Sequence, residues 1–270
     1  MLLAIDSGNT QTVIGLFDGK ELTDHWRIAT VVERTADELA LMVQQFLGFH
    51  GFTLRAEPAR DPDAPAAVLD GGTIDGVAIS SGVPRVTAEL RAMTARYFGF
   101  PALVLEPGVR TGMPILYDNP KEVGADRIAN AVAAYELYGG PSIVVDFGTA
   151  NTIEAVSERG EYLGGAIFPG IEISMDALFG RAAALRRVEL VAPRHVIGKS
   201  TVESIQSGCV FGFSGQVDAL VARFQAELGE CTVVATGGLA DPIIEHSRTI
   251  QHYEPWLTLQ GLRIVFERNR

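Results

Sequence analysis

The sequence predicts an α/β protein that consists of two similar halves with a cleft between them. The main observation is a short signature that occurs twice, as LLAIDSGNTQTV at residues 2–13 and as SIVVDFGTANTI at residues 142–153. Aligned without gaps, the copies share an Asp, a Gly and a Thr: Asp6 with Asp146, Gly8 with Gly148 and Thr12 with Thr152. Such a repeat is typical of a duplicated supersecondary unit. Each half also begins with strands and continues with alternating helices and strands, which favours an α/β architecture.

The first half is predicted to begin with three antiparallel strands. Residues 2–5, 12–17 and 22–28 are apolar or β-branched. The dipeptide Asp18-Gly19 between the second and third runs is a strong hairpin signal. These patterns predict a β-hairpin or meander.

A helix is predicted to follow these strands. Thr35 and Glu38 have the spacing of a capping box, and apolar residues over 39–47 then recur at helical spacing. Residues 55–72 are rich in Ala, Pro and Asp and lack a period, which indicates a surface loop or a partly disordered insertion. The later elements predicted for this half are a strand over 76–80, a helix through 86–97 and a strand over 103–105.

Residues 114–122 are polar, contain a proline and have no clear period. We therefore place the crossing between the halves there and expect domains of residues 1–117 and 118–270. The elements predicted next are a helix that opens at 124–127 and runs to about 138, a hairpin with its turn near 158–160, a helix after 170, a long helix over about 200–228 that is interrupted near 212–215, and a strand over 232–235.

Composition limits the possible partners and location. The 22 basic and 33 acidic residues give a net charge of −11, which disfavours binding to nucleic acid or to anionic membranes. Cys209 and Cys231 have no metal-ligand or CxxC spacing, so we expect free thiols in a reducing compartment. The N-terminus has no signal-peptide pattern and no apolar run is long enough to span a bilayer. These features predict a cytoplasmic protein.

Asp6 and Asp146 are the strongest candidates for chemistry. Each follows a buried strand and precedes a Gly, at the edge of an α/β sheet where ligands bind. Carboxylates in such turns can hold Mg²⁺ or K⁺ and so grip a polyphosphate. Asn9, Thr10 and Thr149 would then donate hydrogen bonds to phosphate oxygens. The alternative is that these side chains only stabilise their own turns, and the repetition favours function over that alternative.

Asp126 is the candidate general base. It lies at a predicted helix start, where the helix dipole favours a negative charge, and a carboxylate there can orient a hydroxyl and accept its proton. Arg127 can pair with a substrate carboxylate. On position alone, an ordinary helix-start acid and a surface ion-pair partner explain these two residues equally well. Gly237 and Gly238 follow a buried strand and would let a base or ribose lie against the backbone, although such turns also occur without a ligand.

With these residues laid out, the sequence resembles the type III pantothenate kinases, a family of the superfamily of acetate and sugar kinases, heat-shock chaperones and actin. The resemblance spans essentially the whole chain. The motifs that carry it are Asp6-x-Gly8-Asn9-Thr10, Ser80-Ser81-x-Val83-Pro84, Asn119-Pro120, Gly124-Ala125-Asp126-Arg127, Asp146-Phe147-Gly148-Thr149-Ala150, Gly164-Gly165-Ala166-Ile167-x-Pro169-Gly170, Gly198-Lys199-x-Thr201 and Thr236-Gly237-Gly238. It implies two actin-like, ribonuclease H-like α/β domains with an active-site cleft between them.

The resemblance also implies an activity and its cofactors. The reaction is ATP-dependent phosphorylation of the primary hydroxyl of pantothenate to 4'-phosphopantothenate, the first step toward coenzyme A. Mg²⁺ would accompany ATP, held by Asp6 through water, and Asp146 would bind a monovalent cation, K⁺ or NH4⁺. The family is a homodimer, and we expect the same assembly for this chain.

By match of position, the family's site residues fall on three sets in this sequence. Asp126 would be the proton acceptor. The expected ATP-binding residues are Asp6, Ser7, Gly8, Asn9, Thr10, Gln11, Thr12, Val13, Thr149, Gly237 and Gly238. The expected pantothenate-binding residues are Tyr117, Gly124, Ala125, Asp126, Arg127 and Thr201.

Two departures from the family pattern and two alternative functions accompany this interpretation. The segment 55–72 is longer than the usual connection, and Asn151 stands where the family more often has Thr or another small residue, which predicts an effect on nucleotide affinity. The alternatives are a non-catalytic nucleotide-binding regulator on the same scaffold and a kinase for another small hydroxy substrate, such as a sugar. Loss of one of the three aspartates would favour the regulator, and all three are present.

Overall fold

The computed structural model describes residues 1–52, 68–69 and 72–270. These residues form two compact units. The first unit contains Met1–Gly112, Lys121–Ala129 and Thr258–Arg270, and the second contains Met113–Pro120 and Asn130–Leu257. The expected loop over 55–72 lies outside the described residues, apart from the paired strands β4 (Val68–Leu69) and β5 (Gly72–Thr73).

The first unit is built on a five-stranded sheet with the order β3-β2-β1-β6-β7. The strands are β1 (Leu2–Ser7), β2 (Gln11–Asp18), β3 (Glu21–Ala29), β6 (Gly76–Ser81) and β7 (Leu103–Val104). The first three pair antiparallel, while β6 and β7 run parallel to β1. The predicted meander and the two later strands are therefore confirmed.

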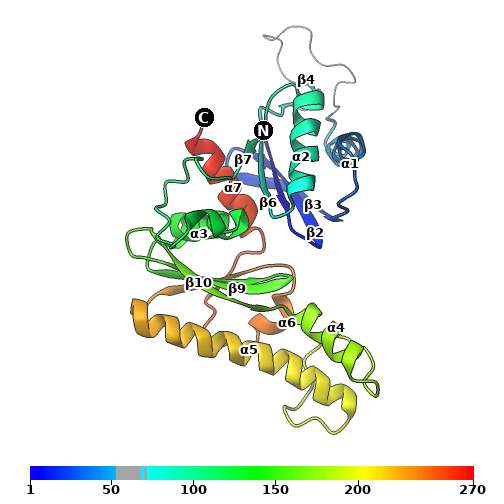
Figure 1. Ribbon diagram of the computed structural model, residues 1–270, viewed down its shortest axis with the longest axis vertical. Coiled ribbons are helices and arrows are strands. Elements are labelled where there is room, and N and C mark those ends of the chain that lie inside the picture. Colours follow the sequence, from blue (N-terminus) through cyan, green and yellow to red (C-terminus); the bar gives the residue numbers. More distant parts are fainter. Residues whose placement is uncertain (53–67, 70–71) are drawn as a thin grey trace. The chain divides into compact units, whose positions relative to one another are not determined.

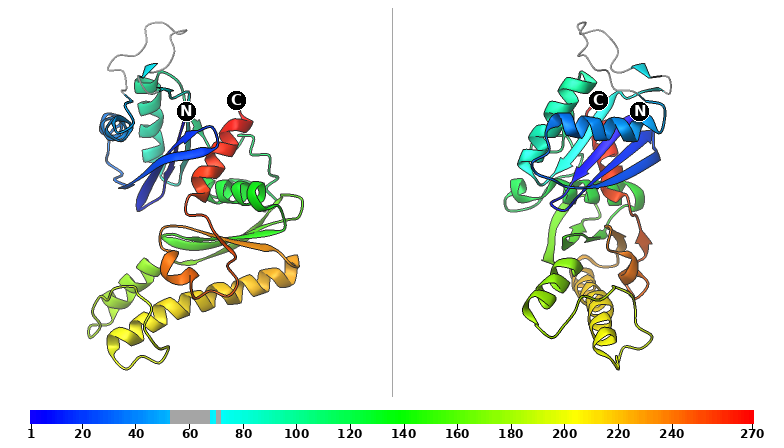
Figure 2. Two further views of the ribbon diagram at one scale, coloured as in Figure 1. Left: turned by 180° about the vertical axis from the view of Figure 1, so that it is seen from behind. Right: turned by 90° about the vertical axis from the view of Figure 1, so that its right-hand side faces the viewer.

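Two helices pack on one face of this sheet, and a third covers the other face (Figures 1 and 2). Helices α1 (Ala36–Gly48) and α2 (Pro84–Met93) bury their apolar sides against the sheet in one core, and α2 continues as the π-helix η1 (Thr94–Phe98). The capping box predicted for α1 is present, because Thr35 accepts from the backbone of Glu38 and Glu38 accepts from the backbone of Thr35.

Helix α7 (Leu257–Arg268) comes from the far end of the chain and was not predicted. It packs closely on the first unit, where a Cβ at Gly76 would lie 2.0 Å from the Phe266 ring. At Gly261 a Cβ would lie 2.0 Å from the carbonyl oxygen of Ala129, so only a glycine allows this approach. Residues 258–270 therefore belong with the N-terminal sheet. A single division of the chain at 117/118 would instead group them with the second half. As a statement about separate functional domains, that division stays a prediction.

The second unit is built on a sheet of the same design, with the order β10-β9-β8-β11-β12. Its strands are β8 (Ser142–Phe147), β9 (Ala150–Val156), β10 (Tyr162–Pro169), β11 (Thr232–Thr236) and β12 (His252–Tyr253). Three strands pair antiparallel, while β11 and β12 run parallel to β8. Identical strand order in both sheets confirms the duplicated α/β unit.

Helices cover both faces of the second sheet (Figure 1). One core joins the sheet to α4 (Ile171–Arg181), α5 (Thr201–Leu228) and the short α6 (Asp241–Ile244). On the other face lies α3 (Ala125–Tyr138), whose first turn is counted with the first unit and which follows the 3-10 turn η2 (Pro120–Glu122). Among the described residues, no helix combines the length and apolar character that a membrane crossing requires.

Helix α5 is continuous, so the predicted interruption near 212–215 is wrong. A glycine costs a helix about 1 kcal/mol relative to alanine. The buried side chains of Val210, Phe213 and Val217 contribute about 1.5–3 kcal/mol each, which outweighs that cost. A Cβ at Gly212 or Gly215 would meet no atom within 4 Å, so neither glycine is required by packing.

The two sheets differ by one residue at the repeated signature. Asp6 lies opposite Val13, whereas Asp146 lies opposite Thr152. The second turn is therefore one residue shorter, and Thr152 corresponds to Val13 rather than to Thr12. The ungapped alignment holds through the Asp and Gly and is wrong beyond the turn.

Candidate functional site

The first signature turn connects β1 to β2 in the first unit. Asp6 is half-buried at the end of β1, and the Gly8 N–H donates to the Gln11 carbonyl at 3.0 Å, which closes the turn. The side chains of Asn9, Thr10 and Gln11 are exposed. These three residues and the backbone of the turn are therefore accessible to a ligand.

Ser7 and Thr12 are buried below this turn, and their hydroxyl groups bond within the protein. The Ser7 and Thr12 hydroxyl oxygens are 2.9 Å apart, and Thr12 is in turn 2.8 Å from the Thr30 hydroxyl. This chain of hydroxyls links the ends of β1, β2 and β3. Both side chains thus stabilise the turn, and the half-buried Val13 continues β2 beside Asp6.

The second signature turn connects β8 to β9 in the second unit. Asp146 is half-buried, as Asp6 is, and Thr149 is exposed. The Asp146 Oδ2 atom accepts a hydrogen bond from Asn130 Nδ2 at 2.9 Å. Asn130 is fully buried on α3 and was not among the predicted residues. In the sequence, Asn130 is a single amide in an alanine-rich helix and belongs to no motif, so nothing local indicates its contact with Asp146.

Two glycines allow the backbone to approach the second turn closely. At Gly237 (φ +99°) a Cβ would lie 2.5 Å from the Phe147 carbonyl oxygen and 2.6 Å from Asp146 Oδ1. At Gly170 a Cβ would lie 2.3 Å from the Thr149 carbonyl oxygen. The turn that ends β11, with the exposed Gly238, is therefore packed directly against the carboxylate of Asp146.

Asn151 lies on the core side of the second turn. The register makes it the counterpart of Thr12, but the counterpart of Ser7 is Phe147, which offers no hydroxyl. Asn151 is fully buried on the same face of β9 as Ile153, and its amide atoms have no hydrogen-bond partner in the described part of the chain. Any effect of Asn151 on nucleotide affinity would thus act through the core.

Helix α3 begins with the predicted proton acceptor. Asp126 is exposed, and its Oδ1 atom accepts a hydrogen bond from the Arg127 backbone N–H at 2.9 Å. A Cβ at Gly124 would lie 2.4 Å from that oxygen, so only a glycine at this position leaves space for the carboxylate. Ala125 follows as the first residue of the helix. Arg127 is only 7% exposed, so its side chain is buried rather than on the surface.

Tyr117 and Thr201 both lie in the second unit. Tyr117 is half-buried beside β10, with its ring 6.3 Å from that of Tyr162. Thr201 is exposed at the start of α5, where Ser200 caps the helix by accepting from the Glu203 N–H.

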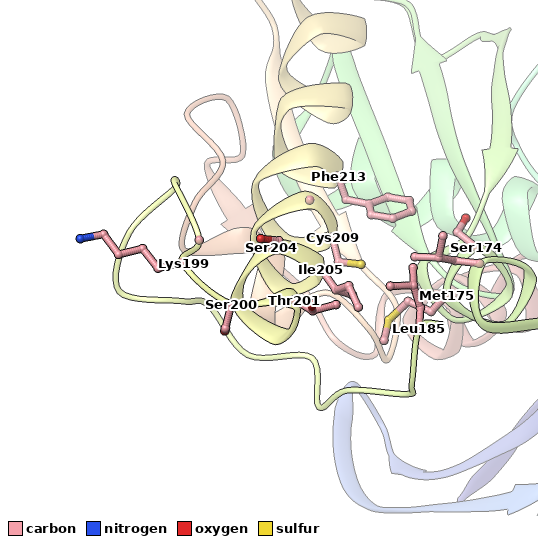
Figure 3. Close-up of a pocket in the computed structure, with 13 residues that line it drawn as sticks. Ser174, Met175, Leu185, Lys199, Ser200, Thr201, Ser204, Ile205, Cys209 and Phe213 are labelled. Carbon is pink, nitrogen blue, oxygen red and sulfur yellow. The ribbon is translucent and has the colours of Figure 1, made fainter. Parts of the chain in front are cut away.

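Thr201 lines a cavity of about 900 Å³ between α4 and the start of α5 (Figure 3). The apolar wall includes Met175, Ile205 and Phe213, and the half-buried Cys209 also lines the cavity. Lys199 points away from the other lining side chains. Burial raises the pKa of the Cys209 thiol, so this cysteine is a protonated, weakly reactive wall residue.

The donor atoms at the two aspartates suit hard cations. Carboxylate and backbone carbonyl oxygens are the ligands that Mg²⁺ and K⁺ prefer. No three His, Cys, Asp or Glu side chains in the described ranges gather as a metal cluster. A cation at either aspartate would take its remaining ligands from the backbone, water or a bound phosphate.

Comparison with known proteins decides the family. The family model described as type III pantothenate kinase matches residues 2–223. The chain belongs to the type III pantothenate kinase family. It is 58% identical over 274 residues to a type III pantothenate kinase of Streptomyces griseus, covering 100% of this chain and 98% of the relative.

Solved structures support the fold expected of a type III pantothenate kinase. Component A of the (R)-2-hydroxyglutaryl-CoA dehydratase of Acidaminococcus fermentans has a TM-score of 0.54 at 14% identity, covering 98% of this chain and 95% of that one. The activator of the 2-hydroxyisocaproyl-CoA dehydratase of Clostridium difficile, with bound ADPNP, has a TM-score of 0.51 at 12% identity, covering 99% and 96%. The two mixed five-stranded sheets with their helices are the actin-like fold, as expected.

Proposed function

We propose that this chain transfers the γ-phosphoryl group of ATP to the primary hydroxyl of pantothenate, giving 4'-phosphopantothenate and ADP. The observation that carries the proposal is the full-length likeness to type III pantothenate kinases combined with an intact Gly124-to-Arg127 motif. In that motif an exposed carboxylate and a buried guanidinium open one helix. Because function resides in sites rather than in folds, the motif carries more weight than the actin-like architecture.

Asp126 is the proton acceptor in this proposal. As the pantothenate oxygen attacks the γ-phosphorus, its O–H proton passes to the Asp126 carboxylate and the bond to the bridging oxygen of ADP breaks. The hydrogen bond from the Arg127 N–H to Oδ1 fixes one carboxylate oxygen and leaves Oδ2 for the substrate. The Arg127 guanidinium pairs with the pantothenate carboxylate, and Tyr117 and Thr201 supply further contacts.

The two signature turns bind the nucleotide. The backbone and exposed side chains of residues 8–11 donate to phosphate oxygens, with Thr149 contributing from the second turn, while Gly237 and Gly238 lie against the adenosine. Asp6 would hold Mg²⁺ through water, and Asp146 would hold K⁺ or NH4⁺. These cations offset the negative charge of the phosphates when bound.

The test is ADP release by the purified protein with ATP, Mg²⁺ and pantothenate, in K⁺ and again in Na⁺. Turnover that requires both pantothenate and K⁺ is the expected result. Tight ATP binding without turnover would instead favour the nucleotide-binding regulator. Turnover with a sugar but not with pantothenate would favour the kinase for another substrate.

Replacing Asn130 by Ala is expected to weaken the cation site. The variant loses the hydrogen bond that orients the Asp146 carboxylate, and loss of such an orienting partner costs roughly 10-fold or more in metal affinity. The K⁺ concentration that gives half-maximal activity should rise accordingly, while the KM for pantothenate stays near the wild-type value. An unchanged K⁺ dependence in a folded variant would remove Asn130 from this role.

The proposal includes a homodimer formed through an apolar surface on α4, the start of α5 and the segment between these helices. The exposed apolar residues of this surface are Ile173, Leu178, Val191, Val196, Ile197 and Val202. Val196 is 66% and Ile197 is 82% exposed, which is costly for two neighbouring aliphatic side chains unless a partner covers them. The expected cytoplasmic location, and the expected absence of nucleic-acid or membrane partners, stay predictions.

Replacing Ile197 by Asp is expected to convert the dimer to a monomer, because the carboxylate would be desolvated at the interface. Light scattering after size-exclusion chromatography measures the mass directly. Leu41 is 62% exposed on α1, so Leu41→Asp is the matched control and should remain dimeric. A wild-type mass near 28.9 kDa at assay concentration would contradict the dimer.

A further inference from the structure

The second unit contains a fully buried carboxylate that the proposed chemistry does not use. Glu154 lies on β9 with no exposed surface, and it accepts a hydrogen bond from the hydroxyl of Tyr162, which is also fully buried. At the neighbouring Gly165 a Cβ would lie 2.1 Å from the Ile153 carbonyl oxygen and 2.7 Å from Glu154 Oε2, so the strand backbone and the carboxylate both pack closely there. Buried carboxylates are rare unless they are paired, and here the Tyr162 hydroxyl is the partner.

Tyr162 also holds the segment that carries Tyr117. The Tyr162 N–H donates to the Pro114 carbonyl at 2.9 Å, and the Leu116 N–H donates to the Tyr162 carbonyl at 2.8 Å. These two bonds form a parallel bridge at Ile115, outside the named strands. Tyr162 therefore fixes the backbone just before Tyr117.

The ring of Tyr117 lies against an irregularity in β10. The register of β10 against β9 shifts between Tyr162 and Gly164, and Gly164 adopts φ +126°, where an L side chain would be strained. A Cβ there would lie 3.6 Å from the Tyr117 ring, so the ring lies over this bulge. The Tyr117 and Tyr162 rings are inclined by 59° with centroids 6.3 Å apart, within the range of a favourable aromatic pair.

We propose that Glu154 and Tyr162 are positioning residues that hold Tyr117 in the orientation needed to contact pantothenate. This inference rests on the proposed function, because the contact between Tyr117 and substrate is part of it. The buried carboxylate fixes the Tyr162 hydroxyl, the Tyr162 ring and backbone fix Tyr117, and neither residue touches the substrate. This arrangement affects the affinity for pantothenate and not the affinity for ATP.

Steady-state kinetics of Tyr162→Phe test the inference. The KM for pantothenate should rise about 10-fold, the equivalent of one hydrogen bond to a charged group, with the KM for ATP within about 2-fold of wild type. Glu154→Gln keeps an acceptor oxygen and should stay close to wild type, whereas Glu154→Ala should resemble Tyr162→Phe. The matched control is Tyr138→Phe, which removes the hydroxyl from another tyrosine–glutamate pair of this unit, Tyr138 with Glu254.

A double-mutant cycle with Tyr117→Ala decides whether the effect passes through Tyr117. In the Tyr117→Ala background, Tyr162→Phe should change the KM for pantothenate by less than about 2-fold, because the group being positioned is gone. Fully additive effects would overturn the inference. So would equal increases in both KM values, or a rise in the KM for pantothenate in Glu154→Gln as large as that in Glu154→Ala.

A readout that needs no turnover separates this inference from the proposed function. In protein with isotope-labelled tyrosine, the Tyr117 ring resonance, assigned with Tyr117→Phe, should shift in Tyr162→Phe and not in Tyr138→Phe. If wild type fails to phosphorylate pantothenate, the proposed function fails while this shift still reports the positioning. An unmoved Tyr117 resonance in folded Tyr162→Phe would overturn the positioning itself.

Discussion

Replacing Asp126 by Asn is expected to lower kcat by about 10²–10⁴-fold, the usual contribution of a positioned general base. The amide has the shape of the carboxylate and its oxygen can still accept the hydrogen bond from the Arg127 N–H, but it cannot take the proton of the substrate hydroxyl. The Kd for ATP should stay nearly unchanged, because the predicted nucleotide contacts lie in the two signature turns and at Gly237 and Gly238, and Asp126 is not among them. ADP release and calorimetric ATP titration measure the two quantities.

The control for this substitution is Asp18→Asn. Asp18 is an exposed carboxylate at the end of β2, and the substitution leaves the two-residue loop Gly19-Lys20 of the β2–β3 hairpin unchanged. Its kcat should equal that of wild type. If Asp126→Asn retained full turnover, Asp126 would not be the proton acceptor and another carboxylate would have to be sought.

Replacing Gly261 by Ala is expected to destabilise the first unit by about 1–3 kcal/mol, the usual cost of an overpacked position. The added methyl group would collide with the Ala129 carbonyl oxygen, so α7 or the first turn of α3 has to move. Asp126 lies three residues before Ala129 on that turn. A loss of kcat should therefore accompany the lower unfolding free energy, which urea denaturation measures.

Gly215→Ala is the matched control, since it makes the same chemical change in another helix. Gly215 is exposed on α5, with no atom within 4 Å of the added Cβ. Here the higher helix propensity of alanine should stabilise the protein by up to about 1 kcal/mol. Equal effects at the two glycines would contradict close packing of α7 on α3.

The sequence predicts the elements whose signals are local. The strand runs near the N-terminus, the hairpin signal at Asp18-Gly19 and the capping box at Thr35 all act over a few residues. The strands, the hairpin and the cap are confirmed, with the hairpin loop at Gly19-Lys20. Helix α7 has no such signal, because its place is set by a sheet whose strands come about 150 to 250 residues earlier in the chain. The continuity of α5 depends on its buried face, which outweighs the glycines that suggested an interruption.

The residues of the candidate site also differ in whether a local sequence pattern reveals them. Residues in glycine-containing turns are recognisable because the turn itself has a sequence pattern, as at Asp6, Asp126 and Asp146. Asn130 and Glu154 lie within a regular helix and strand, where a polar residue has no distinctive neighbours. Their significance arises from partners brought together by folding, Asp146 and Tyr162, and no spacing in the sequence predicts those pairs.

The single-residue difference between the two signature turns shows where a duplicated motif can gain or lose a codon. An in-frame codon lost or gained inside β8 or β9 would turn every following side chain to the opposite face of the sheet and expose the core. Between Gly148 and Ala150 the same event only shortens a loop, and the ladder on both sides keeps its pairing. After a gene duplication, the turns are thus the only part of the motif in which the halves can diverge in length. The residues that can change in number are therefore those proposed to bind the phosphates.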